Sequence, residues 1–299
     1  MTEAQISSSP FSVSAADGYW LKGVRFAPAE KPKAVIVVAG ATAVPQRFYK
    51  PFAQHLARCG YAVLTFDYRG VGRSAPKDLR GFRMDFLDWG RLDLAAVIRE
   101  ATDPDLPLFL VGHSYGGMAL GLLPEDCRVD ALYAFGMGAG WHGWMPRLER
   151  LRVLMLWRVV GPLMVRWKGF LPFRLLGLGE DLPIDVFRQW GHWCRFPHFF
   201  FDDPEARPHL TRYATLTTPI TALNALDDKW ATPASRNAFA AGFGQAPIRR
   251  VDFDAKAAGM APIGHVGYFR PQAQALWDDP RDWFDAQTAA WRRPDEGRG

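Results

Sequence analysis

The stretch that most constrains the fold is an apolar run that stops at a serine between glycines. Residues 108–111 read Leu-Phe-Leu-Val and are followed by Gly-His-Ser114-Tyr-Gly-Gly. The apolar run predicts a buried strand, and the residues from Tyr115 onward predict a helix. Gly112 and Gly116 leave room for a turn that larger residues would obstruct. Such a strand, turn and helix presents the Ser114 hydroxyl at the end of a sheet and aims the following backbone N–H at the same point.

Apolar strands and helical stripes alternate along most of the chain. Two alternating runs, 11–14 and 19–26, predict an antiparallel hairpin at a sheet edge. This alternation predicts a mostly parallel sheet with right-handed crossovers and flanking helices, which is an α/β fold. The other predicted strands, besides the one before Ser114, cover 34–39, 61–66, 129–135, 219–226 and 248–253.

The alternation stops at about residue 139 and resumes at about residue 214. The intervening segment concentrates tryptophan and phenylalanine. We therefore predict an α/β core formed by residues 1–138 and 214–299 and a helical cap, or lid, formed by residues 139–213. Within this insertion, the stretch 147–174 holds seven Lys or Arg residues and one acid, Glu149. Such a basic and apolar stretch indicates a lid packed on the core, a surface that lies on anionic lipid, or an attraction for an acidic acyl substrate.

Polar residues of three types follow predicted strands in a definite order. Ser114 follows a central strand, the acidic pair 227–228 follows a later strand, and His265 follows the last strand. This order resembles that of the α/β-hydrolase superfamily, and the chain outside the insertion is similar to its lipase, esterase and serine-peptidase-like members. The segment 67–74, Asp-Tyr-Arg-Gly-Val-Gly-Arg-Ser, also resembles the D-x-R-G-x-G-x-S segment of that superfamily. We expect the Tyr and Arg of this segment to brace their loop.

Each of these residue types suits a step of acyl transfer. A serine hydroxyl is a weak nucleophile at neutral pH, so a histidine must take its proton during attack and return it to the leaving group. His265 is the only histidine in a late loop beside glycines, and a carboxylate must hold its ring in one tautomer. We assign that role to Asp228, whose spacing from the strand resembles the superfamily pattern, with Asp227 as the alternative. His113 is expected to pack beneath the turn.

The anionic intermediate of such a reaction needs backbone N–H donors. The N–H of Tyr115 is one donor by construction of the turn, and each donor contributes on the order of 3–4 kcal/mol. For the second donor, the resemblance implies the N–H of Ala41, after strand 34–39. The sequence departs from the superfamily at this point, because Ala39-Gly40 stands where the superfamily usually has a His-Gly dipeptide. Since that histidine braces the loop, the departure affects the rigidity of the loop more than the donor.

Other chemistries have weaker support in the sequence. Three cysteines at unrelated spacings indicate neither a disulfide framework nor a zinc ribbon. His192, Cys194 and His198 lack the further ligands of a metal site. The spaced glycines of 136–140 match part of a dinucleotide fingerprint, but no acidic residue follows at the required distance, which favours a hinge. We expect no metal, no other cofactor and no nucleic-acid partner.

Neither a secretory leader nor a membrane-spanning stretch is evident in the sequence, so we expect a soluble cytoplasmic protein. The predicted function is a serine hydrolase that cleaves a carboxylic ester, thioester or amide with an apolar acyl group through an acyl-enzyme. The alternatives are an acyltransferase of the same fold and an inactive hydrolase fold that serves as a binding protein. The sequence indicates a small-molecule acyl substrate without identifying it, and it does not indicate an oligomeric state.

Overall fold

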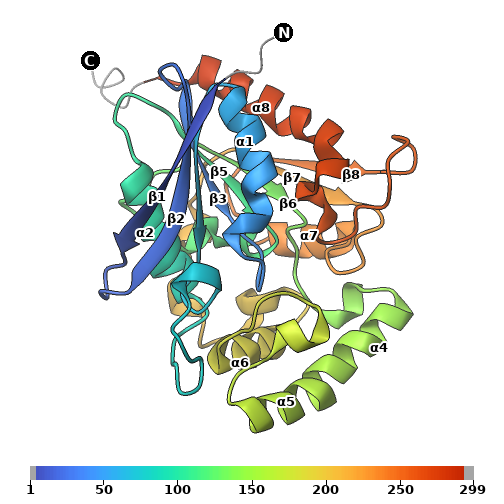
Figure 1. Ribbon diagram of the computed structural model, residues 1–299. Helices are drawn as coiled ribbons and strands as arrows, with labels where there is room; N and C mark the ends of the chain where they lie inside the picture. The colour runs from blue at the N-terminus through green and yellow to red at the C-terminus, as the bar shows by residue number, and fades with distance from the viewer. Residues whose placement is uncertain (1–4, 293–299) are drawn as a thin grey trace.

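One eight-stranded sheet forms the centre of the molecule in the computed structural model, which describes residues 5–292. The strand order is β1-β2-β4-β3-β5-β6-β7-β8. β2 pairs antiparallel with β1 and with β4, and the other pairs are parallel. The mostly parallel sheet flanked by helices is therefore confirmed (Figure 1). The strands are β1 (Ile6–Ser14), β2 (Trp20–Pro28), β3 (Ala34–Ala39), β4 (Tyr61–Asp67), β5 (Leu108–His113), β6 (Ala131–Phe135), β7 (Ile220–Ala225) and β8 (Ile248–Phe253).

Helices of several kinds connect the strands. The α-helices are α1 (Lys50–Arg58), α2 (Ala95–Ala101), α3 (Tyr115–Met118), α4 (Arg147–Met155), α5 (Gly161–Lys168), α6 (Ile184–Trp193), α7 (Pro233–Ala240) and α8 (Asp278–Ala290). Two segments are π-helical: η3 (Trp89–Leu94) leads into α2, and η6 (Leu156–Val160) joins α4 to α5. The short 3₁₀ segments are η1 (Gln46–Tyr49), η2 (Gly72–Ser74), η4 (Ala119–Leu122), η5 (His142–Trp144), η7 (Phe173–Leu176), η8 (Phe199–Asp202), η9 (Arg207–His209), η10 (Thr211–Ala214), η11 (Gly267–Phe269) and η12 (Pro271–Trp277).

The sheet separates two apolar cores, one on each face. Along β3, alternate side chains enter opposite cores because successive residues of a strand point to opposite faces. Ile36 joins the core that contains residues of α1 and α8, whereas Val37 joins the core that contains residues of α2, α3 and α7. All six residues of β3 are buried. Burial on both faces accounts for the continuous apolar sequence of this strand.

The register of the parallel strands brings their C-terminal ends to one edge of the sheet. Ala39 of β3 pairs with Gly112 of β5, and His113 pairs with Phe135 of β6. Ala225 of β7 lies opposite the last residue of β8. The loops that leave these strands therefore begin next to one another. In open α/β sheets this edge is where ligands bind.

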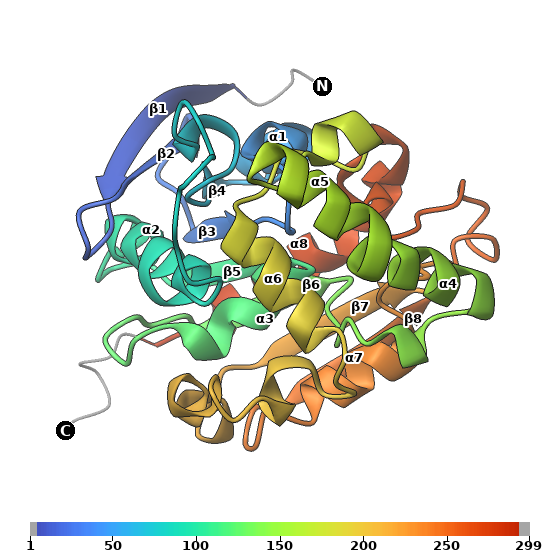
Figure 2. The same cartoon turned by 90° about the horizontal axis from the view of Figure 1, so that it is seen from below.

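The segment 139–213 lies beyond that edge, and its helices α4, α5 and α6 are grouped below the sheet in Figure 1. Residues 147–168 form one continuous helix that runs through α4, η6 and α5. Figure 2 shows α6 beside this helix, in front of the strands of the sheet. On α6, Trp190 contacts Trp157 of the long helix and Trp230 of the loop after β7, with ring centroids 4.9 and 6.0 Å apart. Among the described residues, no helix has the length and apolar character needed to cross a membrane.

Candidate active site

Ser114 occupies a strained turn between β5 and α3. Its backbone has φ 51° and ψ −112°, in a region that residues with a side chain seldom adopt. The glycines on either side make this turn possible. A Cβ on Gly112 would lie 2.3 Å from the Cα of Gly117, and a Cβ on Gly116 would lie 2.0 Å from the carbonyl oxygen of Ala39. The sequence pattern thus reflects close backbone packing that fixes Ser114 at the end of the sheet.

Three of the side chains singled out in the sequence form one hydrogen-bonded chain. Nε2 of His265 lies 3.0 Å from Oγ of Ser114, and Nδ1 of His265 lies 2.8 Å from Oδ2 of Asp228. Ser114 follows β5, Asp228 follows β7, and His265 lies in the loop between β8 and η11. An imidazole held between a hydroxyl and a carboxylate can take a proton from the first while the second stabilises the resulting charge.

The neighbouring acid, Asp227, has a different position. Its two carboxylate oxygens accept the backbone N–H groups of Ile263 and Gly264 at 2.8 and 3.1 Å. These two residues precede His265 in its loop. The structure therefore brings Asp228 to the imidazole, while Asp227 holds the loop that carries it.

The carboxylate of Asp228 is buried and fully engaged. Besides the imidazole, it accepts the N–H groups of Trp230 and Ala231, both at 2.9 Å, and the hydroxyl of Tyr268 at 3.1 Å. Burial opposes ionisation of this carboxyl group, but the charge and hydrogen bond of His265 and the two backbone donors outweigh it, so the pKa of Asp228 lies below its ordinary value. Asp228 is thus held as an anion in one orientation.

His113 lies beneath the turn and links it to two loops. Its Nε2 lies 2.7 Å from the carbonyl oxygen of His265, so this nitrogen carries the proton and donates it. Its Nδ1 is then the acceptor for the hydroxyl of Tyr49, 2.9 Å away. Burial, and next the nearby His265, lower the pKa of His113 to about 3. No sequence pattern pointed to Tyr49, because a tyrosine whose hydroxyl holds a loop looks the same in the sequence as one that only packs its ring.

The two expected oxyanion donors differ in their surroundings. The N–H of Tyr115 has no acceptor within residues 5–292. The N–H of Ala41, in contrast, donates to the hydroxyl of Tyr49 at 2.8 Å, so it is occupied, contrary to what an open donor requires. The next N–H along the chain, that of Thr42, has no acceptor in the described part of the protein. Thr42 and Ser114 both line the cavity described next.

A cavity of about 620 Å³ opens at Ser114 and His265. Its walls come from both parts of the chain and are mostly apolar: the core contributes Val44, Trp230, Ile263 and Val266, and the segment 139–213 contributes Phe173, Leu178 and Trp190. A second cavity, of about 30 Å³, also touches Ser114 and His265 and lies against Phe86, Met118 and the glycines 136, 138 and 140. Ser114 therefore faces one large apolar space and one small one.

A hydrogen bond joins the segment 139–213 to the edge of the sheet that carries Ser114 and His265. Oε1 of Glu149, on α4, accepts the indole N–H of Trp230 at 2.9 Å. The ring of Trp230 stacks on that of His265, with centroids 6.2 Å apart and planes 25° from parallel. Since the backbone N–H of Trp230 also binds Asp228, this residue contacts two members of the hydrogen-bonded chain and the helix above it.

The segment 67–74 forms a loop that is held by hydrogen bonds to Asp67. The carboxylate of Asp67 accepts the backbone N–H groups of Gln46 and Arg73 at 2.7 and 2.9 Å, and the hydroxyl of Ser74 donates to its carbonyl oxygen at 2.7 Å. A Cβ on Gly72 would lie 2.6 Å from the Asp67 carboxyl group, and the φ of Gly72 is 51°. The spaced glycine in the pattern is therefore required by the position of the aspartate.

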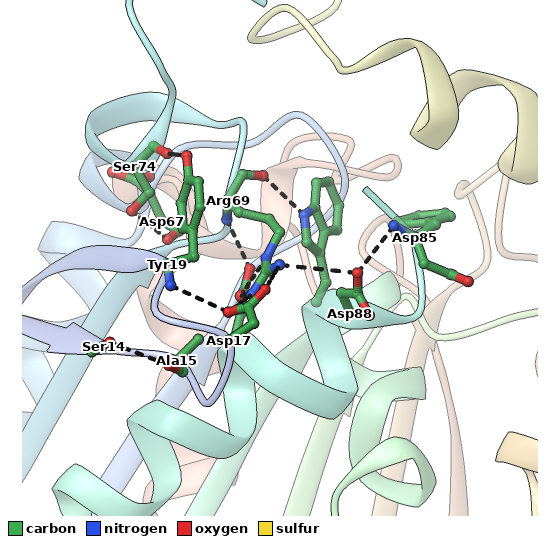
Figure 3. Close-up of polar contacts among 12 residues, drawn as sticks. Ser14, Ala15, Asp17, Tyr19, Asp67, Arg69, Ser74, Asp85 and Asp88 are labelled. Carbon is green, nitrogen blue, oxygen red and sulfur yellow. Dashed lines mark hydrogen bonds and ion pairs between the residues drawn. The ribbon is translucent and has the colours of Figure 1, made fainter. Parts of the chain in front are cut away.

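In this loop, the guanidinium of Arg69 lies between the carboxylates of Asp17 and Asp88 and forms ion pairs with both (Figure 3). Its side chain is 5% exposed, and its Nε lies 2.7 Å from Oδ1 of the fully buried Asp93. Burial raises the pKa of Asp93 to about 7, against the opposing effect of Arg69. Tyr68 stacks on Trp89 with ring centroids 4.8 Å apart. Tyr68 and Arg69 thus brace their loop, as expected.

The candidate metal residues lie in separate interactions. His192 is 3.6 Å from Asp203, His198 is 3.2 Å from Asp202, and Cys194 is buried. Within residues 5–292, no three His, Cys, Asp or Glu side chains are grouped so as to hold a metal ion.

Known proteins resemble this chain in part of its sequence and in its fold. Residues 30–168 match the family described as serine aminopeptidase, S33. Comparison with curated proteins gave no match.

Solved structures resemble the chain over nearly its whole length. DcsB, in complex with its substrate analogue, is 16% identical with a TM-score of 0.65, and the match covers 95% of this chain and 100% of that one. A soluble variant of monoglyceride lipase from Saccharomyces cerevisiae is 13% identical with a TM-score of 0.63 and 96% of each chain covered. Haloalkane dehalogenase DbeA from Bradyrhizobium elkani is 16% identical, with a TM-score of 0.61 and coverage of 96% and 100%.

At these identities the structural likeness shows a shared fold, and a fold of this kind carries several chemistries, as the names lipase and dehalogenase indicate. Residues 30–168 are thus similar to a family of serine aminopeptidases, and the chain as a whole has the α/β-hydrolase fold.

Proposed function

We propose that the protein is a serine hydrolase that cleaves a carboxylic ester, or a thioester or amide, with an apolar acyl group. The observation that carries the proposal is the hydrogen-bonded chain Ser114–His265–Asp228, with distances of 3.0 and 2.8 Å, whose Ser114 and His265 line a cavity of about 620 Å³. A binding protein without catalysis has no need for a strained serine aligned on an imidazole and a buried carboxylate.

In the proposed reaction, Oγ of Ser114 attacks the carbonyl carbon of the substrate while Nε2 of His265 takes its proton. Asp228 stabilises the imidazolium through Nδ1 and keeps its own negative charge. The imidazolium then protonates the leaving group, which departs and leaves the acyl group on Ser114. A water molecule activated by His265 repeats the sequence and releases the acid.

The oxyanion that forms in each half-reaction is assigned two backbone donors. The N–H of Tyr115 is open, as the turn requires. For the second donor, Ala41 must first lose its hydrogen bond to Tyr49, whereas Thr42 needs no such exchange. We therefore assign the second role to the loop 41–42, with the N–H of Thr42 as the donor that is ready in this structure. Each donor contributes on the order of 3–4 kcal/mol to transition-state stabilisation.

The walls of the larger cavity favour an apolar acyl group. Phe173, Leu178 and Trp190 come from segment 139–213, so this segment acts as the lid that sets acyl specificity. Each methylene that enters such a space contributes about 0.8 kcal/mol, and kcat/KM should therefore rise by up to about fourfold per carbon until the cavity is full. The monoglyceride lipase among the structural neighbours supports an ester substrate.

The test is labelling with a fluorophosphonate probe, together with turnover of p-nitrophenyl esters of increasing chain length. Ser114→Ala should abolish labelling and turnover. Ser12→Ala, which changes an exposed serine on β1, should leave both unchanged. Labelling that persists in Ser114→Ala would remove Ser114 from the mechanism. A profile that does not rise with chain length in the unaltered protein would contradict the acyl assignment, and products transferred to an added alcohol in preference to water would indicate an acyltransferase.

A further inference from the structure

The long helix 147–168 exposes a stripe of large apolar side chains, which we call the outer stripe. Figure 2 shows α4 and α5 running across the face turned to the viewer, with no other element in front of them. The exposed fractions range from 43% to 69%, which is high for side chains of this kind. The outer stripe consists of Leu148, Leu151, Met155, Val159, Leu163 and Trp167.

The helix is apolar on two sides, and only one of them has a partner. Val153, Leu156 and Val165 are buried, and Leu156 and Val165 belong to the core that also holds Phe187 of α6. A surface helix of a soluble protein normally carries polar residues opposite its buried side. The outer stripe occupies that position here, so packing within the chain does not account for it.

The spacing of the outer stripe matches the geometry of the helix. From Leu151 onward its members recur every four residues, which is slightly more than the 3.6 residues of an α-helical turn. Such a series winds around a straight α-helix. The wider π-helical turn η6 lies in the middle of the series and reduces this winding. Sequence and backbone thus agree in keeping the apolar residues on one side.

Cations without carboxylate partners flank the outer stripe. Within residues 5–292, Arg147, Arg150, Arg158, Arg166 and Lys168 form no ion pair. The nearby acids are turned away from the surface: the side chain of Glu149 is 13% exposed and binds Trp230, and that of Glu180 is 4% exposed and pairs with Arg174. The face is therefore apolar along its centre and positively charged along its sides.

We propose that this face docks on the surface of an anionic lipid bilayer, with the helix lying in the plane of the interface. An apolar stripe flanked by Lys and Arg fits such a surface, since the apolar side chains enter the acyl boundary while the cations meet the headgroups. A second copy of the chain fits less well, because a two-fold contact through this face brings equal clusters of cations together. The proposal stands independently of the proposed hydrolase activity.

The test is co-sedimentation of the full chain with vesicles, which needs no substrate. We expect binding to vesicles of phosphatidylcholine mixed with phosphatidylserine, weaker binding to phosphatidylcholine alone, and a decrease as salt screens the charges. Trp167→Ser should lower the partition coefficient about tenfold, and Arg158→Glu about fivefold or more. The matched controls are Trp20→Ser, which removes an indole 60% exposed on β2, and Lys31→Glu, which reverses an exposed charge. Both should bind like the unaltered protein.

Each other outcome overturns the proposal. Failure to bind the anionic vesicles, or equal losses in Trp167→Ser and Trp20→Ser, shows that the outer stripe does not dock on lipid. A dimer in solution that Trp167→Ser dissociates, without any vesicle binding, shows that a second copy covers the face. Circular dichroism and esterase turnover of the same variants show that they remain folded, so a loss of binding is assigned to the surface. Absence of turnover in the unaltered protein would count against the hydrolase proposal and would leave the docking proposal unaffected.

Discussion

At the edge of the sheet that carries Ser114 and His265, polar groups are paired within the chain, whereas the long helix 147–168 leaves cations and apolar side chains exposed. At the edge, every oxygen of the Asp227 and Asp228 carboxylates has a donor, and His113 uses both of its ring nitrogens. On the helix, Arg147, Arg158 and Arg166 have no carboxylate partner within the described residues, and large apolar side chains face outward. Hydrogen bonds within the chain therefore hold the edge in one geometry. The exposed side of the long helix has no such partners among the described residues, and we expect a partner outside the chain to cover it.

The comparison predicts that the largest effects come from the edge, where one group orients another. Asp228→Asn should lower kcat by about 10⁴-fold, because an amide does not keep His265 in the required tautomer or stabilise its positive charge. Asp227→Asn retains an oxygen that accepts from the loop, so it should reduce kcat by less than about tenfold. Steady-state kinetics of the two variants, with thermal unfolding as a control for folding, measure the difference. The opposite ranking would transfer the orienting role to Asp227.

A second prediction compares the loss of a buried cation with the loss of an exposed cation in the α/β part of the chain. Arg69→Met leaves the buried Asp93 without its cation and should lower the free energy of unfolding by about 3–5 kcal/mol. The matched control is Arg25→Met. Arg25 and Glu100 form an ion pair whose side chains are 41% and 40% exposed, and breaking it should cost about 0–1 kcal/mol. Urea denaturation of the two variants tests this. Equal losses would mean that Asp93 takes up a proton and needs no partner.

A third prediction uses the pH dependence of stability to test whether His113, beneath Ser114, is held in its neutral form. The pKa of His113 is lowered from its ordinary 6.5 to about 3 in the folded protein. Between these two values the unfolded chain binds a proton that the folded chain does not, so stability must fall as the pH falls through this range. The slope from this residue is about 1.4 kcal/mol per pH unit.

His113→Gln retains a side-chain N–H for the carbonyl oxygen of His265 but does not titrate. Its unfolding free energy should therefore decline less steeply than that of the unaltered protein between about pH 6 and pH 4. Denaturation curves at a series of pH values provide the measurement. Parallel slopes for the two proteins would show that His113 takes up a proton in the folded state and is not held neutral by burial.

Much of the edge that carries Ser114 and His265 could be predicted because the backbone of the turn and the order of the strands leave patterns in the sequence. The turn around Ser114 needs glycines where Cβ atoms would meet backbone at 2.3 and 2.0 Å, and such constraints appear directly in the sequence. Parallel strands end at one edge, so the order of Ser114, the acidic pair and His265 predicted that they could meet.

The remaining features depend on side-chain positions that no local pattern fixes. The N–H of Ala41 donates to the hydroxyl of Tyr49, which the short segment η1 places there, so the donor expected at Ala41 is occupied in the structure. In the sequence, Asp227 and Asp228 differ only by one position in their spacing from the strand. In the structure, Asp228 binds the imidazole of His265 and Asp227 binds the backbone of the loop. The seven cations of 147–174 were visible, but the exposed apolar stripe among them was not. An apolar residue on a helix is expected to be buried until the packing is known.

The smallest predicted effect concerns the hydrogen bond that joins the two regions. Glu149 of α4 accepts the indole N–H of Trp230, whose ring stacks on His265 and whose backbone N–H binds Asp228. Glu149→Ala leaves the half-buried indole N–H without its acceptor and should lower the free energy of unfolding by about 1 kcal/mol. Because Trp230 also lines the larger cavity, kcat/KM for long-chain esters should fall severalfold, while short-chain esters should be affected less.

Glu149→Gln is the matched control, because its amide oxygen can still accept the indole N–H, and it should behave nearly like the unaltered protein. The measurement is kcat/KM across the ester series for both variants. If Glu149→Ala lowered turnover of short and long esters equally, the hydrogen bond would act on the orientation of His265 and Asp228 and not on the acyl cavity. If neither variant differed from the unaltered protein, the long helix would be positioned by α6 alone, through contacts such as that of Trp157 with Trp190, and the two regions would be joined only by packing.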